Sequence, residues 1–159
     1  MRTFHLKGYL KPYLSLSQGF LPLSSITDIT PPNDVDTGIS AADFTRGQAF
    51  YDLMLEVDPS NDDIVFAGGI DLFRSTDNGS TWNQISKWSN NNNLSGLGVS
   101  LVHADQHGAF FRPGTGNSNK VVFTTDGGIF YCDDITQAAS STTAIQERNN
   151  GLITAQFYT

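Results

Sequence analysis

The chain has 159 residues, enough for one globular domain with its own core and too few for two large domains. Its net charge is −7, and neither a basic stripe nor a long apolar run is visible. We therefore do not expect the chain to bind nucleic acid or an anionic membrane surface, or to contain a membrane span. Cys132 is the single cysteine, which excludes an internal disulfide and a cysteine-based zinc cluster.

The residue types favour β-strands joined by tight turns. Of the sixteen acidic residues, fourteen are Asp, which favours turns and caps, and only two are Glu, which favours helix interiors. Eleven Phe, five Tyr and two Trp add side chains that are common in strands. These choices predict an all-β fold.

Residues 1–47 are predicted to form an irregular N-terminal segment. Four prolines within residues 1–32 favour extended or irregular backbone, and residues 33–47 have the composition of a loop. Lys11 and Pro12 interrupt the apolar stretch that a signal peptide needs. We therefore interpret the beginning as a lead-in or as the end of a preceding structural unit.

From residue 48 onward, short strand-like runs recur and are separated by turn residues. The first four predicted runs are 50–57, 63–67, 71–75 and 81–86.

The pattern returns 57 residues later. Val121-Val122-Phe123 matches Ile64-Val65-Phe66, and Ile129-Phe130 matches Leu72-Phe73. A repeat of this length with four short strands is typical of a β-propeller blade. Residues 48–159 are therefore predicted to hold two antiparallel four-stranded blades, at about 48–87 and 100–147, and the start of a third at 151. Because a closed propeller needs about 4–8 blades, we expect further blades from a longer chain or from other copies.

One octapeptide between two strand runs has the pattern S-x-D-x-G-x-x-W, running from Ser75 to Trp82. The Asp77 carboxylate can accept hydrogen bonds from nearby backbone N–H groups, as Asx-turns do. Gly79 can adopt a left-handed backbone, and Trp82 can bury its ring between strands. Ser75, Asp77, Gly79 and Trp82 are thus expected to be structural.

This octapeptide matches the BNR or Asp-box repeat, and about residues 47–159 resemble secreted bacterial BNR-repeat proteins, relatives of sortilin-like, xyloglucanase-like and sialidase-like propellers. The second copy, Cys132-Asp133-Asp134, lacks the following Gly and Trp. The resemblance implies an incomplete propeller at an extracellular location. It does not extend to the arginine cluster of sialidases, because the arginines here do not follow that pattern.

The most polar predicted strand is 102–107. Since strand side chains alternate, His103, Asp105 and His107 are expected on one face. The resemblance makes this the innermost strand, beside the central channel. The three side chains either form a polar channel wall, with Asp105 orienting an imidazole, or bind ligand. Positions two apart on a strand are about 6.7 Å apart, so all three could share a metal ion only on a bent strand. We expect no metal and no cofactor.

Carbohydrate or glycoconjugate binding is the expected function, with His103, His107 and Trp88 as ligand-binding residues. Trp88 can stack on a sugar, or it can pack in the core or form a loop lid. One alternative is a xyloglucanase-like glycoside hydrolase in which Asp105 and Asp52 form the carboxylate pair; Asp52 can equally be a channel-wall residue. The other alternative is a sortilin-like propeller that binds a protein partner.

Overall fold

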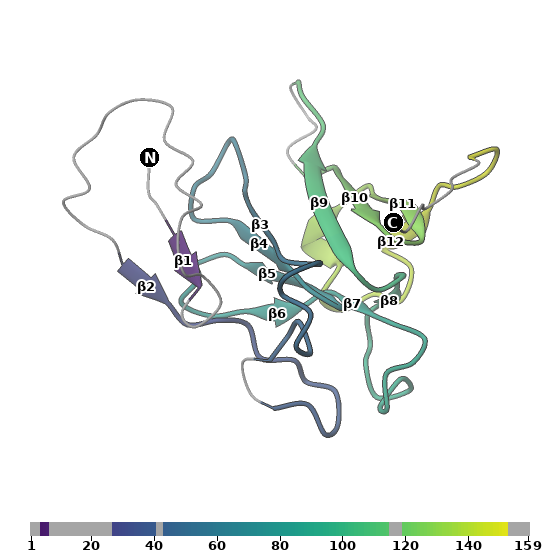
Figure 1. Cartoon of the computed structure of the whole chain (residues 1–159). Helices are drawn as coiled ribbons and strands as arrows, with labels where there is room; N and C mark the ends of the chain where they lie inside the picture. Colours follow the sequence, from purple (N-terminus) through teal and green to yellow (C-terminus); the bar gives the residue numbers. More distant parts are fainter. Residues whose placement is uncertain (1–3, 7–26, 41–42, 115–118, 153–159) are drawn as a thin grey trace.

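The computed structural model describes residues 4–6, 27–40, 43–114 and 119–152 (Figure 1). The fold of these residues is all-β, as predicted: they form twelve short strands and one 3-10 turn, η1 (Ile135–Gln137), without an α-helix. Accordingly, the described part of the chain contains no helix that is long and apolar enough to cross a membrane.

The first large sheet is an antiparallel meander of four strands. Its strands, in spatial order, are β3 (Met54–Val57), β4 (Val65–Gly68), β5 (Leu72–Ser75) and β6 (Asn83–Gln84). Each overlaps one of the four runs that the sequence predicts.

The second large sheet repeats this arrangement. Its strands, in spatial order, are β9 (Gln106–Phe111), β10 (Val121–Thr125), β11 (Gly128–Cys132) and β12 (Ile145–Glu147). Between the sheets, β7 (Ser86–Lys87) and β8 (Ser100–Leu101) form a short parallel pair. The described residues do not form a closed ring, and residues 153–159 of the predicted third blade lie outside them.

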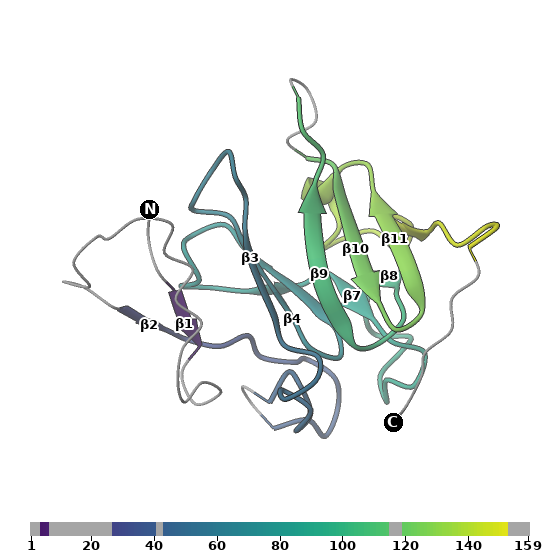
Figure 2. The same cartoon turned by 45° about the horizontal axis from the view of Figure 1, so that its top comes forward.

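The two sheets pack against each other and enclose the main core. Strand β9 lies against β3 and β4, as both views show (Figures 1 and 2). Phe66 of β4 contacts Phe111 and Phe123 of the second sheet, with ring centroids 5.5 and 6.0 Å away. Aromatic side chains bury large apolar areas, so these contacts are a major part of what holds the sheets together.

The N-terminal segment covers the opposite face of the first sheet. Phe44 packs edge-on against Phe73, with centroids 5.7 Å apart, in a cluster that also includes Ile29 and Ala67. All four residues of β4 are therefore buried. The segment also contains the parallel pair β1 (Phe4–Leu6) and β2 (Thr27–Ile29). Within the segment 1–47, which is predicted to be irregular, this pair is regular structure that the composition did not indicate, because pairing between distant short segments has no signal in local composition.

The hairpins β4–β5 and β10–β11 do not superimpose at the constant offset of 57 residues that the sequence predicts. Phe66 pairs with Arg74, whereas Phe123 pairs with Phe130, the match of Phe73. In the first hairpin, three residues lie between the last paired residues, Gly68 and Leu72. In the second hairpin, only two residues lie between the last paired residues, Thr125 and Gly128. A slip of one residue turns every side chain to the other face of a strand. Phe66 and Phe123 consequently face each other across the sheet interface rather than occupying equivalent places.

The turn after β5 is organised by the side chains of the octapeptide. The Ser75 hydroxyl donates to Asp77 and accepts from the N–H groups of Asp77 and Gly79. Asp77 accepts from the N–H and hydroxyl of Thr81, while Gly79 has φ +79°. The Trp82 indole donates to the carbonyl of Thr30, 2.8 Å away, and so ties this turn to the N-terminal segment.

Candidate functional site

One end of the sheet interface brings together side chains from three separate parts of the chain. Tyr51 and Asp52 precede β3, Asp105 precedes β9 and His107 is the second residue of that strand, and Asp126 lies in the turn between β10 and β11. We call Tyr51, Asp52, Asp105, His107 and Asp126 the junction cluster.

Gln106 holds the start of β9 in place beside the first sheet. Its backbone N–H donates to the carbonyl of Gly69, and its side-chain amide donates to the carbonyls of Ile70 and His103. A Cβ on Gly68 would lie 2.6 Å from Cβ of Gln106, so the close approach of the strands requires glycine there. The position of the junction cluster therefore depends on the packing of the two sheets.

Tyr51, His107 and Asp126 form a connected surface group. The Tyr51 hydroxyl donates to Asp126, with distances of 2.9 and 3.0 Å to its two carboxylate oxygens. Nε2 of His107 lies 2.6 Å from Oδ1 of Asp126, and the His107 and Tyr51 rings meet edge-on at 5.3 Å. Tyr51 is 41% exposed and the preceding Phe50 is 90% exposed. Solvent thus reaches the Tyr51 ring beside the Asp126 carboxylate.

Asp52 is the buried member of the cluster. Its exposed fraction is 0%, and neither carboxyl oxygen has a hydrogen-bond partner among the other described residues. Burial raises the pKa of Asp52 to about 7, and the nearby charges of Asp105 and Asp126 contribute to this shift. A buried polar group without partners is costly, and such groups are concentrated at functional positions.

Asp105 and His107 do not lie on a common strand face with His103, so that prediction was wrong. The strand begins only at Gln106, and Asp105 has a left-handed backbone with φ 63°. The pairing of β9 with β10 then shifts around His107, because Gln106 pairs with Thr125 and Gly108 with Thr124. A bulge of this kind redirects a side chain. It leaves His107 beside Asp126, and burial together with the Asp126 charge raises the pKa of Asp105.

His103 lies at the edge of this region. Its Nδ1 is 3.1 Å from the carbonyl of Ala104, and its ring packs so closely over Gly127 that a Cβ there would meet ring atoms. Trp88 is half-buried directly after β7, and its carbonyl accepts from the N–H of Asn91. Neither contact involves a residue of the junction cluster.

Sequence reasoning did not identify Tyr51 and Asp126 as site residues. Tyr51 falls within the predicted run 50–57, and Asp126 falls between the two matched runs at 121–123 and 129–130, so neither is distinguished from its neighbours. The two side chains are 75 residues apart in the sequence, so their contact has no local signal. The clearest indication is the Asp-Gly turn between two apolar runs, which predicts a hairpin and so places Asp126 at its tip.

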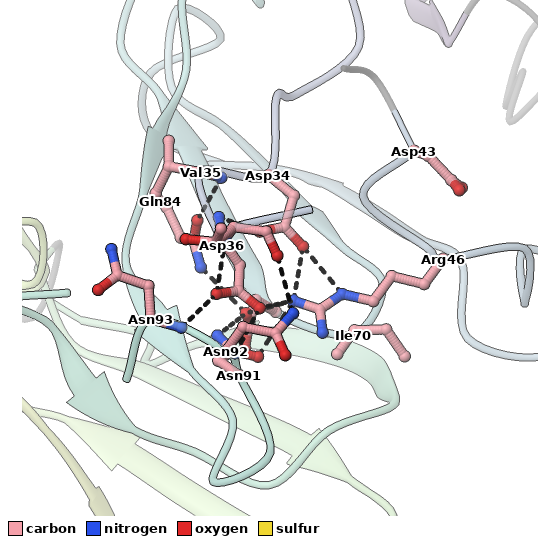
Figure 3. Close-up of polar contacts among 12 residues, drawn as sticks. Asp34, Val35, Asp36, Asp43, Arg46, Ile70, Gln84, Asn91, Asn92 and Asn93 are labelled. Carbon is pink, nitrogen blue, oxygen red and sulfur yellow. Dashed lines mark hydrogen bonds and ion pairs between the residues drawn. The ribbon is translucent and has the colours of Figure 1, made fainter. Parts of the chain in front are cut away.

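A second polar cluster surrounds Arg46 on the other side of the first sheet. Its guanidinium donates to Asp34 at 2.8 and 3.0 Å, to Asp36 at 3.4 Å and to Asn91 at 3.0 Å. Asp71 lies 3.7 Å from it. Figure 3 shows the Arg46 side chain reaching into this group of carboxylates and amides.

This Arg46 cluster joins the N-terminal segment to the loop after β7. Asp36 accepts from the N–H groups of Asn92 and Asn93, and Asp71 accepts from the side-chain amides of Gln84 and Asn91. Burial raises the pKa of Asp71 to about 7. Because Arg46 already occupies the centre as the cation, we interpret this cluster as a structural clamp (Figure 3).

In the part of the chain that the structure describes, no group of three His, Cys, Asp or Glu side chains has an arrangement suited to a metal ion. The comparisons with known proteins give no relative: no family model, no curated protein and no solved structure matches this chain. The case for a function therefore depends on the junction cluster and on the sequence motif.

Proposed function

We propose that the chain is a segment of a secreted, propeller-like protein that binds carbohydrate or glycoconjugate at the junction cluster. The observation that carries this proposal is the exposed group formed by Tyr51, His107 and Asp126. A carboxylate can accept hydrogen bonds from sugar hydroxyls, and imidazole and phenol groups can both donate to them and accept from them. The rings of Phe50 and Tyr51 supply an apolar surface on which a sugar ring can stack.

The Asp-box resemblance bears on the position of the site and not on its ligand class, since it implies a propeller whose ligands bind beside the inner strands. On that interpretation β3 and β9 are the inner strands of their blades, and the cluster lies where they begin. Hydrogen bonds from Gln106 link the start of β9 to the β4–β5 turn. A site whose backbone is already tied in place loses less conformational entropy when a ligand binds.

The test is calorimetric titration of the chain with cellotetraose, a xyloglucan heptasaccharide and a tetramer of N-acetylglucosamine. We expect binding of at least one, weakened about tenfold or more by Asp126→Asn or Phe50→Ala.

The chain offers a matched control in the pair Tyr131 and Asp133, which does not belong to the cluster. The Tyr131 hydroxyl donates a hydrogen bond of 2.9 Å to Asp133, as the Tyr51 hydroxyl does to Asp126. Asp133→Asn should leave the affinity unchanged. No binding of any of the three saccharides, or an equal loss in Asp126→Asn and Asp133→Asn, would contradict the proposal.

A glycoside hydrolase is the second candidate, and the ionisation of Asp52 favours it. A carboxyl group with a pKa near 7 is partly protonated at neutral pH, as a general acid must be. Full burial argues against this role, because an acid must reach the glycosidic oxygen. Release of reducing sugar from xyloglucan by the wild type, lost in Asp105→Asn with folding retained, would favour hydrolysis over binding.

A further inference from the structure

The dipeptide Asn-Gly occurs twice in the sequence, at residues 78–79 and at residues 150–151. An asparagine before a glycine is prone to lose its side-chain amide, because glycine has no side chain that hinders attack by its own backbone nitrogen. Both glycines have a left-handed backbone, with φ +79° at Gly79 and +81° at Gly151. The two dipeptides therefore differ in their burial and hydrogen bonding rather than in the backbone of their glycines.

The first dipeptide is held inside the turn after β5. Gly79 is buried, and its N–H donates to the Ser75 hydroxyl at 2.8 Å. The side-chain amide of Asn78 donates to the Asp63 carboxylate at 2.6 Å, and the Asn78 N–H donates to the carbonyl of Asp63. A backbone nitrogen that donates a hydrogen bond retains its proton, and the Asn78 amide must release Asp63 before it can turn towards that nitrogen. Both reacting groups of this dipeptide are thus engaged elsewhere.

The second dipeptide lies in the turn that follows β12, where both residues are exposed. In the described part of the chain, neither the Asn150 side chain nor the Gly151 N–H has a hydrogen-bond partner. A Cβ on Gly151 would meet nothing within 4 Å, so the space beside this residue is open. Neither reacting group of this dipeptide is held.

We propose that Asn150 is a site of spontaneous deamidation and that the fold protects Asn78 from the same reaction. The Gly151 nitrogen loses its proton and bonds to Cγ of Asn150, while the bond from Cγ to the amide nitrogen breaks and ammonia leaves with the proton. Water then opens the cyclic imide at either of its two carbonyls. The product is aspartate or isoaspartate, and no oxidant or reductant takes part. This inference is independent of the proposed carbohydrate function.

The modified residue would lie next to the side chain that anchors the β10–β11 turn. Asn149 accepts from the N–H of Ile129 at 2.7 Å and donates to the carbonyl of Gly127 at 2.6 Å. It also donates to the Glu147 carboxylate at 2.9 Å. Deamidation of the following residue adds a negative charge, and isoaspartate also lengthens the backbone there. The β10–β11 turn carries Asp126, so this change takes place beside one part of the candidate site.

The experiment incubates the folded chain in a mildly alkaline buffer and follows each dipeptide by peptide mass spectrometry. Trypsin cleaves after Arg74, Lys87 and Arg148, which places the two dipeptides in separate peptides. Deamidation raises a peptide mass by about 1 Da. We expect conversion at Asn150 to be about tenfold or more faster than at Asn78, because hydrogen bonds in the turn must open before Asn78 can react.

Two variants and one solvent condition separate the effect of the fold from that of the sequence. Gly151→Ala should slow conversion at Asn150 and leave that at Asn78 unchanged. Ser75→Ala removes the acceptor of the Gly79 N–H, so it should speed conversion at Asn78 alone. In urea that unfolds the chain, both dipeptides should be converted at similar rates.

Each outcome decides. Equal rates at the two sites of the folded chain, or a faster reaction at Asn78, overturn the proposal. It is also overturned if Asn150 reacts in urea but not in the folded chain. A difference that persists in urea would arise from neighbouring residues and not from the fold, and would overturn it as well. The comparison of native with unfolded wild type decides even if Ser75→Ala does not fold, which circular dichroism shows.

Discussion

Gln106 of β9 lies directly over Gly68 of β4, with only 2.6 Å between its Cβ and the position that a Cβ on residue 68 would occupy. At the same place, the Gln106 N–H donates to the carbonyl of Gly69. This contact joins the two sheets at the end where the junction cluster lies.

Gly68→Ala should therefore destabilise the chain by about 1–3 kcal/mol, because the added methyl would lie 2.6 Å from Cβ of Gln106, an atom fixed to the backbone that cannot move away as a flexible side-chain end can. Urea denaturation measures the effect. Gly98→Ala is the matched control, since a Cβ at residue 98 meets nothing within 4 Å and should change stability by no more than about 0.5 kcal/mol. Equal effects of the two substitutions would show that the close strand contact is unimportant.

The stability of the chain should fall as the pH rises from about 4 to about 7. The pKa of both Asp52 and Asp71 is about 7 in the folded chain and 3.8 as the ordinary value, so the folded state binds more protons over this range. Their contribution is complete below pH 4 and is lost by the time the pH passes 7.

Asp52→Asn removes one of these two groups, so it should flatten the pH dependence and stabilise the chain at pH 8 by up to about 4 kcal/mol. Denaturant midpoints at pH 4, 6 and 8 test this. The control is Asp62→Asn, a substitution of an exposed residue, and it should keep the wild-type slope of stability against pH. A variant Asp52→Asn with an unchanged slope would contradict the ionisation of Asp52 derived from its burial.

Arg46→Met should cost about 3–5 kcal/mol, because it leaves the buried carboxylates of Asp34 and Asp36 without their cation. Arg148→Met is the comparison: this arginine is exposed and lies 5.7 Å from the Tyr131 ring centroid. Thermal unfolding of both variants decides the matter. Similar melting temperatures would mean that the Arg46 cluster is not a clamp.

Ser75→Ala should destabilise the turn after β5 by about 1–3 kcal/mol, since the buried hydroxyl accepts from two N–H groups and donates to Asp77. Ser80→Ala in the same turn removes an exposed hydroxyl and is expected to be neutral. The free energy of unfolding in urea separates the two. If Ser75→Ala is also neutral, the hydrogen bonds around Ser75 do not stabilise the fold.

The sequence by itself determined the all-β class, the two groups of four strands and the turn chemistry around Asp77. These features are local: alternation, aromatic residues and Asx-turns act over a few neighbouring residues. The sequence also indicated Asp105 and His107, because a row of ionisable side chains in one predicted strand needs solvent or partners, and it indicated Asp52 as the second carboxylate of a pair.

Only the tertiary structure decided which residues meet. A hairpin shorter by one residue set the faces of β10, and the bulge at His107 turned that imidazole towards Asp126. Tyr51 meets Asp126 across 75 residues, and Arg46 meets Asn91 across 45. Such contacts arise because two sheets and an N-terminal segment pack into one core, and the packing of distant segments cannot be inferred from local patterns.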